Sequence, residues 1–167
     1  RRITAPSQLS VRPTTDAGKE CLFNILANHF SFSAISFLDL FAGTGNISYE
    51  ASSRGCTDIT AVDQEYKCTG FIKSTVSDFE MEGFQVVRND VYKYLQNLNR
   101  TFDIIFADPP YMSPDTVNAH QIVFERDLLN KGGFLIIEHG NDEKFDNLPH
   151  LKDKREIGNV NFTIFNP

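Results

Sequence analysis

The sequence lacks several features that mark particular classes of protein. It has no tryptophan, and no apolar run approaches the ~20 residues that a membrane-spanning helix needs. No segment resembles a secretory signal, so we expect a cytoplasmic protein that is not inserted in a membrane. Cysteine is scarce and odd in number, which argues against disulfides or a zinc site and favours reduced, buried thiols. The three cysteines are Cys21, Cys56 and Cys68.

Positive charge is scarce as well. The formal net charge of −6 argues against a protein that grips nucleic acid over its whole surface. The first 20 residues are an exception, because they carry four basic residues against two acidic ones: Arg1, Arg2, Arg12 and Lys19 against Asp16 and Glu20. Any contact with a polyanion is therefore expected near the N-terminus. The opening Arg1-Arg2-Ile3 is also typical of a chain that starts inside a longer gene product.

What the sequence does contain is a repeated order of strand, loop and helix. Apolar runs predict five strands, at 35–40, 59–62, 84–87, 102–107 and 134–138. Amphipathic patterns predict the helices between them, through Ile47 and Ala51, at 65–82, at 91–98 and around 122–123. Two strand-like runs at 154–157 and 160–165 flank Gly158-Asn159, which is a hairpin signal.

These elements predict an α/β fold with a Rossmann-like, doubly wound, mostly parallel sheet. We expect seven strands, helices on both faces and an antiparallel C-terminal hairpin. A chain of 167 residues is long enough for one domain, residues 1–167. Within it we predict an extended arm at 1–13, an N-terminal helix at 14–30 and an α/β core at 35–167.

The fourth predicted strand runs straight into an acidic and proline-rich stretch. Asp108, Pro109, Pro110 and Tyr111 follow the apolar run at 102–107. A proline cannot donate to a sheet ladder, so the strand must end there, and each proline holds the residue before it in an extended geometry. The carboxyl ends of the strands are where open α/β sheets bind their ligands. Asp108 is therefore a candidate ligand-binding side chain, although a lone stretch of this kind can also be a simple turn.

Three further acids end the three preceding strands, namely Asp39, Asp63 and Asp90. Each alone could be a turn or helix-cap residue, but four acids on consecutive strand ends are hard to explain as caps. Gly43-x-Gly45 lets the backbone pass close to a ligand and opens a helix. Ser48 only partly meets the third position of a dinucleotide fingerprint, and Asp39 lies where a pyrophosphate would bind.

The pattern favours a nucleoside cofactor with a cationic end over a dinucleotide. An acid with the spacing of Asp63 from the glycine turn can accept hydrogen bonds from both ribose hydroxyls. Asp90 can accept one from an adenine amino group. We assign no metal ligand and no role to the scattered histidines.

These residues have the layout of class I S-adenosylmethionine-dependent methyltransferases. The segment Asp39 to Gly45 resembles their cofactor loop, and Asp108 to Tyr111 resembles the motif of enzymes that methylate amino groups. Three blocks resemble the bacterial 16S rRNA (guanine-N2)-methyltransferase family more closely: Arg12 to Asn24, Leu38 to Gly45, and Phe102 to Tyr111. The closing Gly158 to Phe162 resembles the C-terminal hairpin of the same family.

The resemblance implies an enzyme that uses S-adenosylmethionine and modifies 16S rRNA or a 30S assembly particle, as a monomer without a metal. It implies cofactor contacts from Asp39, Phe41, Ala42, Gly43, Thr44, Gly45, Asp63, Asp90, Val91 and Asp108. The catalytic set would be Asp108, Pro109, Pro110 and Tyr111, with Tyr111 stacked on the flipped base. Contacts to the RNA would come from Arg12, Thr14, Lys19 and Tyr111.

Other functions remain compatible with the sequence. The same chemistry could act on amino groups of DNA adenine or cytosine, or on a glutamine side-chain amide. A cofactor-binding module without catalysis should show a damaged glycine turn or Asp-Pro-Pro-Tyr stretch, whereas both are intact here. A dinucleotide-dependent oxidoreductase would bind NAD rather than S-adenosylhomocysteine.

Overall fold

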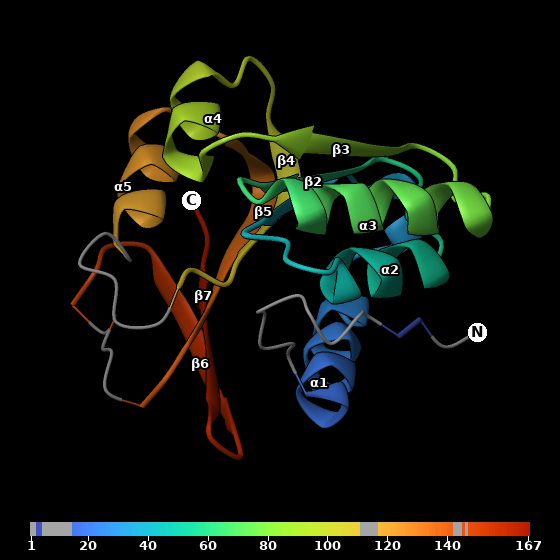
Figure 1. Cartoon of the computed structure of the whole chain (residues 1–167). Helices are drawn as coiled ribbons and strands as arrows, with labels where there is room; N and C mark the ends of the chain where they lie inside the picture. Colours follow the sequence, from blue (N-terminus) through green and yellow to red (C-terminus); the bar gives the residue numbers. More distant parts are fainter. Residues whose placement is uncertain (1–2, 5–14, 111–116, 142–144, 146) are drawn as a thin grey trace.

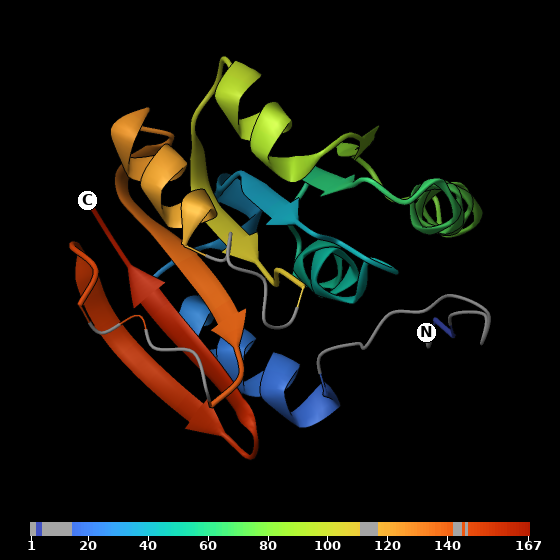
Figure 2. The same ribbon diagram turned by 60° about the vertical axis from the view of Figure 1, so that its left-hand side comes forward.

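The protein is built on one mixed sheet that has helices on both faces (Figures 1 and 2). The computed structural model describes residues 3–4, 15–110, 117–141, 145 and 147–167. Within these ranges the strands are β1 (Phe37–Leu40), β2 (Ile59–Asp63), β3 (Phe84–Arg88), β4 (Phe102–Ala107), β5 (Leu129–His139), β6 (Leu151–Ile157) and β7 (Val160–Phe165). They form a seven-stranded sheet in the order β3-β2-β1-β4-β5-β7-β6.

The strand order reverses between β1 and β4. Strands β1 to β5 pair in parallel, and β7 pairs antiparallel with both β5 and β6. The chain leaves β3 and returns beside β1, where Leu40 lies opposite Ala107. A reversal of this kind leaves a crevice outside the carboxyl ends of the two central strands. The predicted doubly wound sheet with an antiparallel hairpin is confirmed.

The helices divide between the two faces of the sheet. Their bounds are α1 (Asp16–Ala27), the short 3-10 helix η1 (Phe32–Ala34), α2 (Asn46–Ser53), α3 (Tyr66–Asp78), α4 (Val91–Asn97) and α5 (Asn118–Glu125). Helices α4 and α5 cover one face, and α1, α2 and α3 cover the other (Figure 2). None of the helices in the described ranges is long and apolar enough to cross a bilayer.

The central strands are buried on both faces, which explains their continuous apolar sequence. In β1, Leu38 and Leu40 pack in the cluster beneath α4 and α5, whereas Phe37 packs in the cluster beneath α1 and α2. Because side chains alternate along a strand, Asp39 shares the face of Phe37. An acid therefore lies within an otherwise apolar layer, near the carboxyl end of β1.

Several elements differ from their predicted bounds. The N-terminal helix is Asp16–Ala27 rather than 14–30, β6 begins at Leu151 rather than at 154, and α3 and β5 differ for identifiable reasons. Helix α3 ends at Asp78 rather than near 82, because Glu80 has a positive φ of 52° and the Met81 N–H binds the Val76 carbonyl at 3.0 Å. This is a Schellman-type end, which here uses a glutamate where glycine is usual. Strand β5 begins at Leu129, five residues before the predicted start, and continues through Gly132 and Gly133. A Cβ at Gly133 would lie 2.6 Å from the Asp103 carbonyl oxygen, so the strands approach too closely for a side chain.

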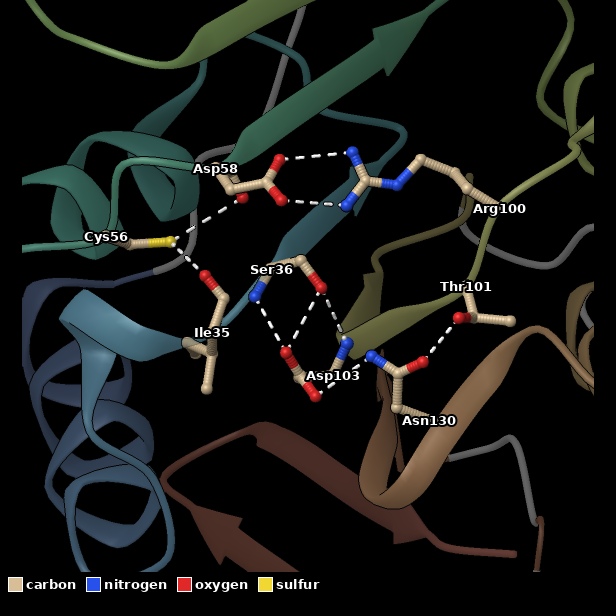
Figure 3. A network of polar contacts seen from close by, with 8 residues as sticks. All are labelled: Ile35, Ser36, Cys56, Asp58, Arg100, Thr101, Asp103 and Asn130. Carbon is tan, nitrogen blue, oxygen red and sulfur yellow. Dashed lines mark hydrogen bonds and ion pairs between the residues drawn. The ribbon is translucent and has the colours of Figure 1, made fainter.

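A network of polar side chains closes the amino-terminal edge of the sheet (Figure 3). The Asp103 carboxylate accepts hydrogen bonds from the Ser36 N–H at 2.9 Å, the Ser36 hydroxyl at 3.2 Å and the Asn130 amide at 3.0 Å. The Asp103 N–H donates in turn to the Ser36 hydroxyl at 3.0 Å. Beside them, Arg100 donates to both oxygens of Asp58, at 3.2 and 2.8 Å. These contacts join residues at or just before the amino-terminal ends of β1, β2, β4 and β5.

Candidate active site

The loop after β1 has a backbone that only certain residues tolerate. Phe41 and Gly43 have φ of 58°, and Gly45, the N-cap of α2, has φ of 90°. A Cβ at Gly45 would meet the ring of Tyr49 at 2.6 Å, so a side chain cannot be placed there. The loop thus turns sharply from the end of β1 into α2 and presents main chain at the switch point. Ala42 and Thr44 complete it, and Thr44 is buried.

Asp63 fixes this loop from the end of β2. Its Oδ2 accepts the Gly43 N–H at 2.8 Å, and its Oδ1 accepts the Glu65 N–H at 2.9 Å. An ionised carboxylate has about four acceptor positions, so two of them remain for ribose hydroxyls. Gly43 and Asp63 are 20 residues apart in the sequence, and in the structure they are in direct contact.

Asp90 follows β3 and caps α4. Its Oδ1 accepts the Lys93 N–H at 3.0 Å, which is the geometry of an ordinary N-cap. The next residue, Val91, is buried in the apolar cluster between the sheet and helices α4 and α5. The rings of Phe41 and Tyr92 meet edge to face with centroids 5.8 Å apart. The loop after β1 therefore contacts the first turn of α4. A contact of Asp90 or Val91 with adenine stays a prediction.

Asp39 is the most buried acid of the site, with 1% of its surface exposed. The Ser48 hydroxyl donates to its Oδ2 at 2.6 Å. Burial raises the pKa of Asp39 to about 7; the Ser48 hydrogen bond opposes this shift, and the nearby charges of Asp63 and Glu138 add to it. A carboxyl group held near neutrality among other acids favours a cationic ligand. These carboxylate acceptors fit the ammonium end of S-adenosylmethionine.

Asp108 directly follows β4, between the end of β1 and the end of β5. It is half-buried, while Pro109 is buried and Pro110 is exposed. The structure thus brings four predicted acids to one edge of the sheet: Asp39, Asp63, Asp90 and Asp108. No group of three or more potential metal ligands occurs within the described ranges.

Of the four residues predicted to contact RNA, the structure describes only Lys19. Arg12, Thr14 and Tyr111 lie outside the described residues. Lys19 lies on α1, where its ammonium group is 3.7 Å from an oxygen of Asp16 and 3.9 Å from one of Glu50 on α2. These two carboxylates would compete with a phosphate for Lys19, whose role in RNA binding stays a prediction.

The sequence interpretation passed over one further acid at this edge. Glu138, near the end of β5, is only 3% exposed. The sequence carried a signal for it, since Phe134 to Glu138 is an apolar strand that ends in an acid, like the four strands before it. Five strands were predicted, but site roles were assigned only to the acids that end the first four.

The reversed strand order, the glycine turn and the acid-lined edge together define the fold of a class I methyltransferase. The chain belongs to the family described as "Conserved hypothetical protein 95", whose model matches residues 1–166. The resemblance to a family that methylates small-subunit (16S) rRNA is confirmed, because relatives of this chain are named "Ribosomal RNA small subunit methyltransferase D".

Two curated relatives illustrate the similarity. The chain is 35% identical over 143 residues to Bacillus subtilis YlbH, named provisionally as an rRNA methyltransferase; the match covers 83% of this chain and 77% of that protein. It is 26% identical over 168 residues to a Buchnera aphidicola protein named "Ribosomal RNA small subunit methyltransferase D", with 98% and 85% covered.

Solved structures show the same fold. A Thermus thermophilus protein of undescribed function has a TM-score of 0.87 at 25% identity, and the match covers 100% of this chain and 94% of that one. A methyltransferase-like protein, SMU.776, solved in complex with S-adenosylhomocysteine, has a TM-score of 0.70 at 18% identity, with 87% and 48% covered.

Proposed function

We propose that this protein transfers the methyl group of S-adenosylmethionine to the exocyclic N2 amine of a guanine in 16S rRNA. The observation that carries the proposal is that Asp108-Pro109-Pro110 directly follows β4, the strand that pairs with β1 just before the glycine turn, at the switch point of the sheet. Methyl donor and acceptor would then meet across β1 and β4. The names of the relatives support an S-adenosylmethionine-dependent rRNA methyltransferase, and the finer assignment to guanine N2 is our own.

The cofactor half of the site consists of the β1 loop and the acids on its far side. Asp63 has acceptor positions for the ribose, and the buried Asp39 suits the cationic amino-acid end of the cofactor. Asp90 and Val91 would bound the adenine. The sulfonium is itself an activated electrophile, so the protein's part is to hold donor and acceptor in line.

The substrate half must activate a poor nucleophile. The lone pair of the guanine amine is delocalised into the ring, so the nitrogen attacks well only when it becomes pyramidal. Asp108 and the Pro109 carbonyl, each accepting one N–H of the amine, favour that geometry. As the methyl group bonds to nitrogen the amine protons become acidic, and Asp108 holds or takes one of them. Tyr111 would stack on the base.

The RNA reaches this half from the N-terminal side, where Arg12, Thr14 and Lys19 would contact it. An acidic protein of net charge −6 is poorly suited to hold long naked RNA, which favours 16S rRNA within a 30S assembly particle. The protein would act as a monomer, in the cytoplasm where ribosomal subunits are made.

A transfer assay tests this function. Purified protein is incubated with S-adenosylmethionine labelled in the methyl group and with 30S particles that lack the modification, free 16S rRNA, DNA or protein extract. We expect label in 16S rRNA. Label only in DNA would favour the adenine or cytosine alternative, and label only in protein would favour the glutamine alternative.

A further inference from the structure

Glu138 and Asp108 leave adjacent strands at the same level. In the parallel pairing of β4 with β5, Ala107 lies opposite Ile137. Continued by one residue, this register puts Asp108, which directly follows β4, beside Glu138. Neighbouring strands are ~4.8 Å apart, and paired residues of parallel strands point to the same face. Asp108 stays extended because a proline follows it. The register therefore places two carboxylates together at the carboxyl end of the sheet.

The burial of Glu138 calls for a functional explanation. It is 3% exposed and lies opposite Phe162 of β7, in a position where an apolar residue would stabilise the fold. Among the described residues, Asp39 is the other acid that is buried to this degree. Both acids lie on one face at the ligand-binding edge, and the charge of Glu138 acts on Asp39. The location of this buried carboxylate, at the carboxyl end of the sheet and on the face of Asp39, points to ligand recognition.

The end of β5 is held rigidly around Glu138. The next residue, His139, shares a hydrogen bond of 2.6 Å between its Nε2 and the Thr163 hydroxyl on β7. The His139 ring also packs on Phe145, with centroids 4.6 Å apart. These contacts fix the strand end against its neighbour, so the glutamate side chain starts from a defined position.

From this geometry we infer that Glu138 selects guanine, by accepting the hydrogen bond of the ring N1–H while Asp108 accepts from the neighbouring amine. The inference rests on the proposed function and adds a residue that recognises the base. Guanine presents N1–H and the 2-amino group side by side, which matches two carboxylates on adjacent strands. Adenine and cytosine carry an unprotonated acceptor at the corresponding ring nitrogen, which would face the carboxylate without a proton between them.

Base analogues test the inference directly. Once the methylated guanosine is mapped, that single nucleotide is replaced by 2,6-diaminopurine, which keeps the 2-amino group but has an unprotonated N1. The wild-type protein should methylate guanosine in 30S particles at least about 100-fold faster, because the analogue has no N1–H to donate to the carboxylate. Glu138→Gln, whose amide can donate to N1, should reduce this preference to within about tenfold.

Two controls separate the outcomes. Glu156→Gln removes a charge from an exposed glutamate on β6 and should leave the preference unchanged. Saturable S-adenosylhomocysteine binding by Glu138→Gln shows that the variant is folded, and if it does not fold the wild-type preference alone decides. Guanosine methylation at N2 with equal use of the analogue, or an unchanged preference in folded Glu138→Gln, overturns the inference alone. Absence of N2 methylation in the wild type overturns the proposed function and this inference with it.

Discussion

The two edges of the parallel sheet treat their acidic side chains in different ways. At the amino-terminal edge, Asp103 is bound by three side-chain and main-chain donors, and Asp58 is paired with Arg100. At the carboxyl-terminal edge, Asp39 accepts hydrogen bonds from the hydroxyl and the main chain of Ser48, and no ion pair within the described ranges involves Asp39, Asp63 or Asp90.

This difference separates structural acids from acids kept for a ligand. Acids whose charge is satisfied by the protein stabilise the fold, whereas acids gathered without a cation oppose it and become favourable when a cationic cofactor binds. Substitutions of acids at the amino-terminal edge should therefore lower the stability of the fold. Substitutions of acids at the carboxyl-terminal edge should instead lower ligand binding or catalysis.

The largest effect is expected from Asp108→Ala. Loss of a carboxylate that accepts the amine proton should lower the transfer rate by about 10²–10⁴-fold. Affinity for S-adenosylhomocysteine, measured by calorimetry, should stay within a few fold of the wild type. Joint loss of transfer and cofactor binding would instead assign Asp108 to the cofactor half or to the stability of the fold.

Asp39→Asn should stabilise the protein while weakening cofactor binding. Because the pKa of Asp39 is raised from 3.8 to about 7 in the folded state, the unfolded chain loses this proton first as pH rises. Folding stability falls between those values, by about 4 kcal/mol in total at ~1.4 kcal/mol per pKa unit. Asparagine keeps the Ser48 hydrogen bond and avoids the loss, so urea unfolding should show a stability gain that grows between about pH 4 and pH 7 and stays constant above that range.

The same carboxyl group should make cofactor binding depend on pH. A cationic ligand favours ionised Asp39, so the Kd of wild-type protein for S-adenosylmethionine should fall as pH rises from about 6 to about 8. The fall should level off above the pKa and should be much smaller in Asp39→Asn. An equal pH dependence in both proteins would contradict the assignment of the cationic end to Asp39.

At the opposite edge, Asp103→Ala should destabilise the fold by about 2–4 kcal/mol. The substitution leaves the buried Ser36 N–H and the Asn130 amide without their acceptor. Urea unfolding measures the loss, and the folded fraction should bind S-adenosylhomocysteine as the wild type does. A change in cofactor affinity at constant folded fraction would show that the two edges are coupled.

The smallest effect is expected from Arg100→Gln. The ion pair with Asp58 is about half exposed on both sides, at 44% and 48%, so it should contribute less than about 1 kcal/mol to stability. Part of any loss would come from the contact of the guanidinium with the Phe102 ring, whose centroid is 4.2 Å away. A loss of several kcal/mol, measured by urea unfolding, would mean that the network acts as one unit.

Local patterns in the sequence predicted most of the fold. The apolar runs of β1 to β4 and the turn at Gly158-Asn159 identified the strands and the hairpin, because buried parallel strands need continuous apolar sequence. The end of α3 was missed since Glu80 adopts a left-handed conformation that sequence rarely reveals in a glutamate. The start of β5 was missed because Gly132 and Gly133 suggested a turn.

The site could be predicted in outline for a similar reason. Acids at the ends of successive strands share one edge, so Asp39, Asp63, Asp90 and Asp108 could be grouped before the structure was seen. What sequence could not give is the environment of each acid. The raised pKa of Asp39 depends on its burial and on the nearby Ser48 and Glu138. The Asp103 carboxylate accepts hydrogen bonds from Ser36, which is 67 residues away in the chain.

The most direct test of this account is nucleoside mass spectrometry of 16S rRNA from 30S particles incubated with the protein and S-adenosylmethionine. The account predicts one new residue of N2-methylguanosine, present with wild-type protein and absent with Asp108→Ala. A methyl group on a ring nitrogen, on ribose or on another base would contradict the assignment of Asp108 to an exocyclic guanine amine.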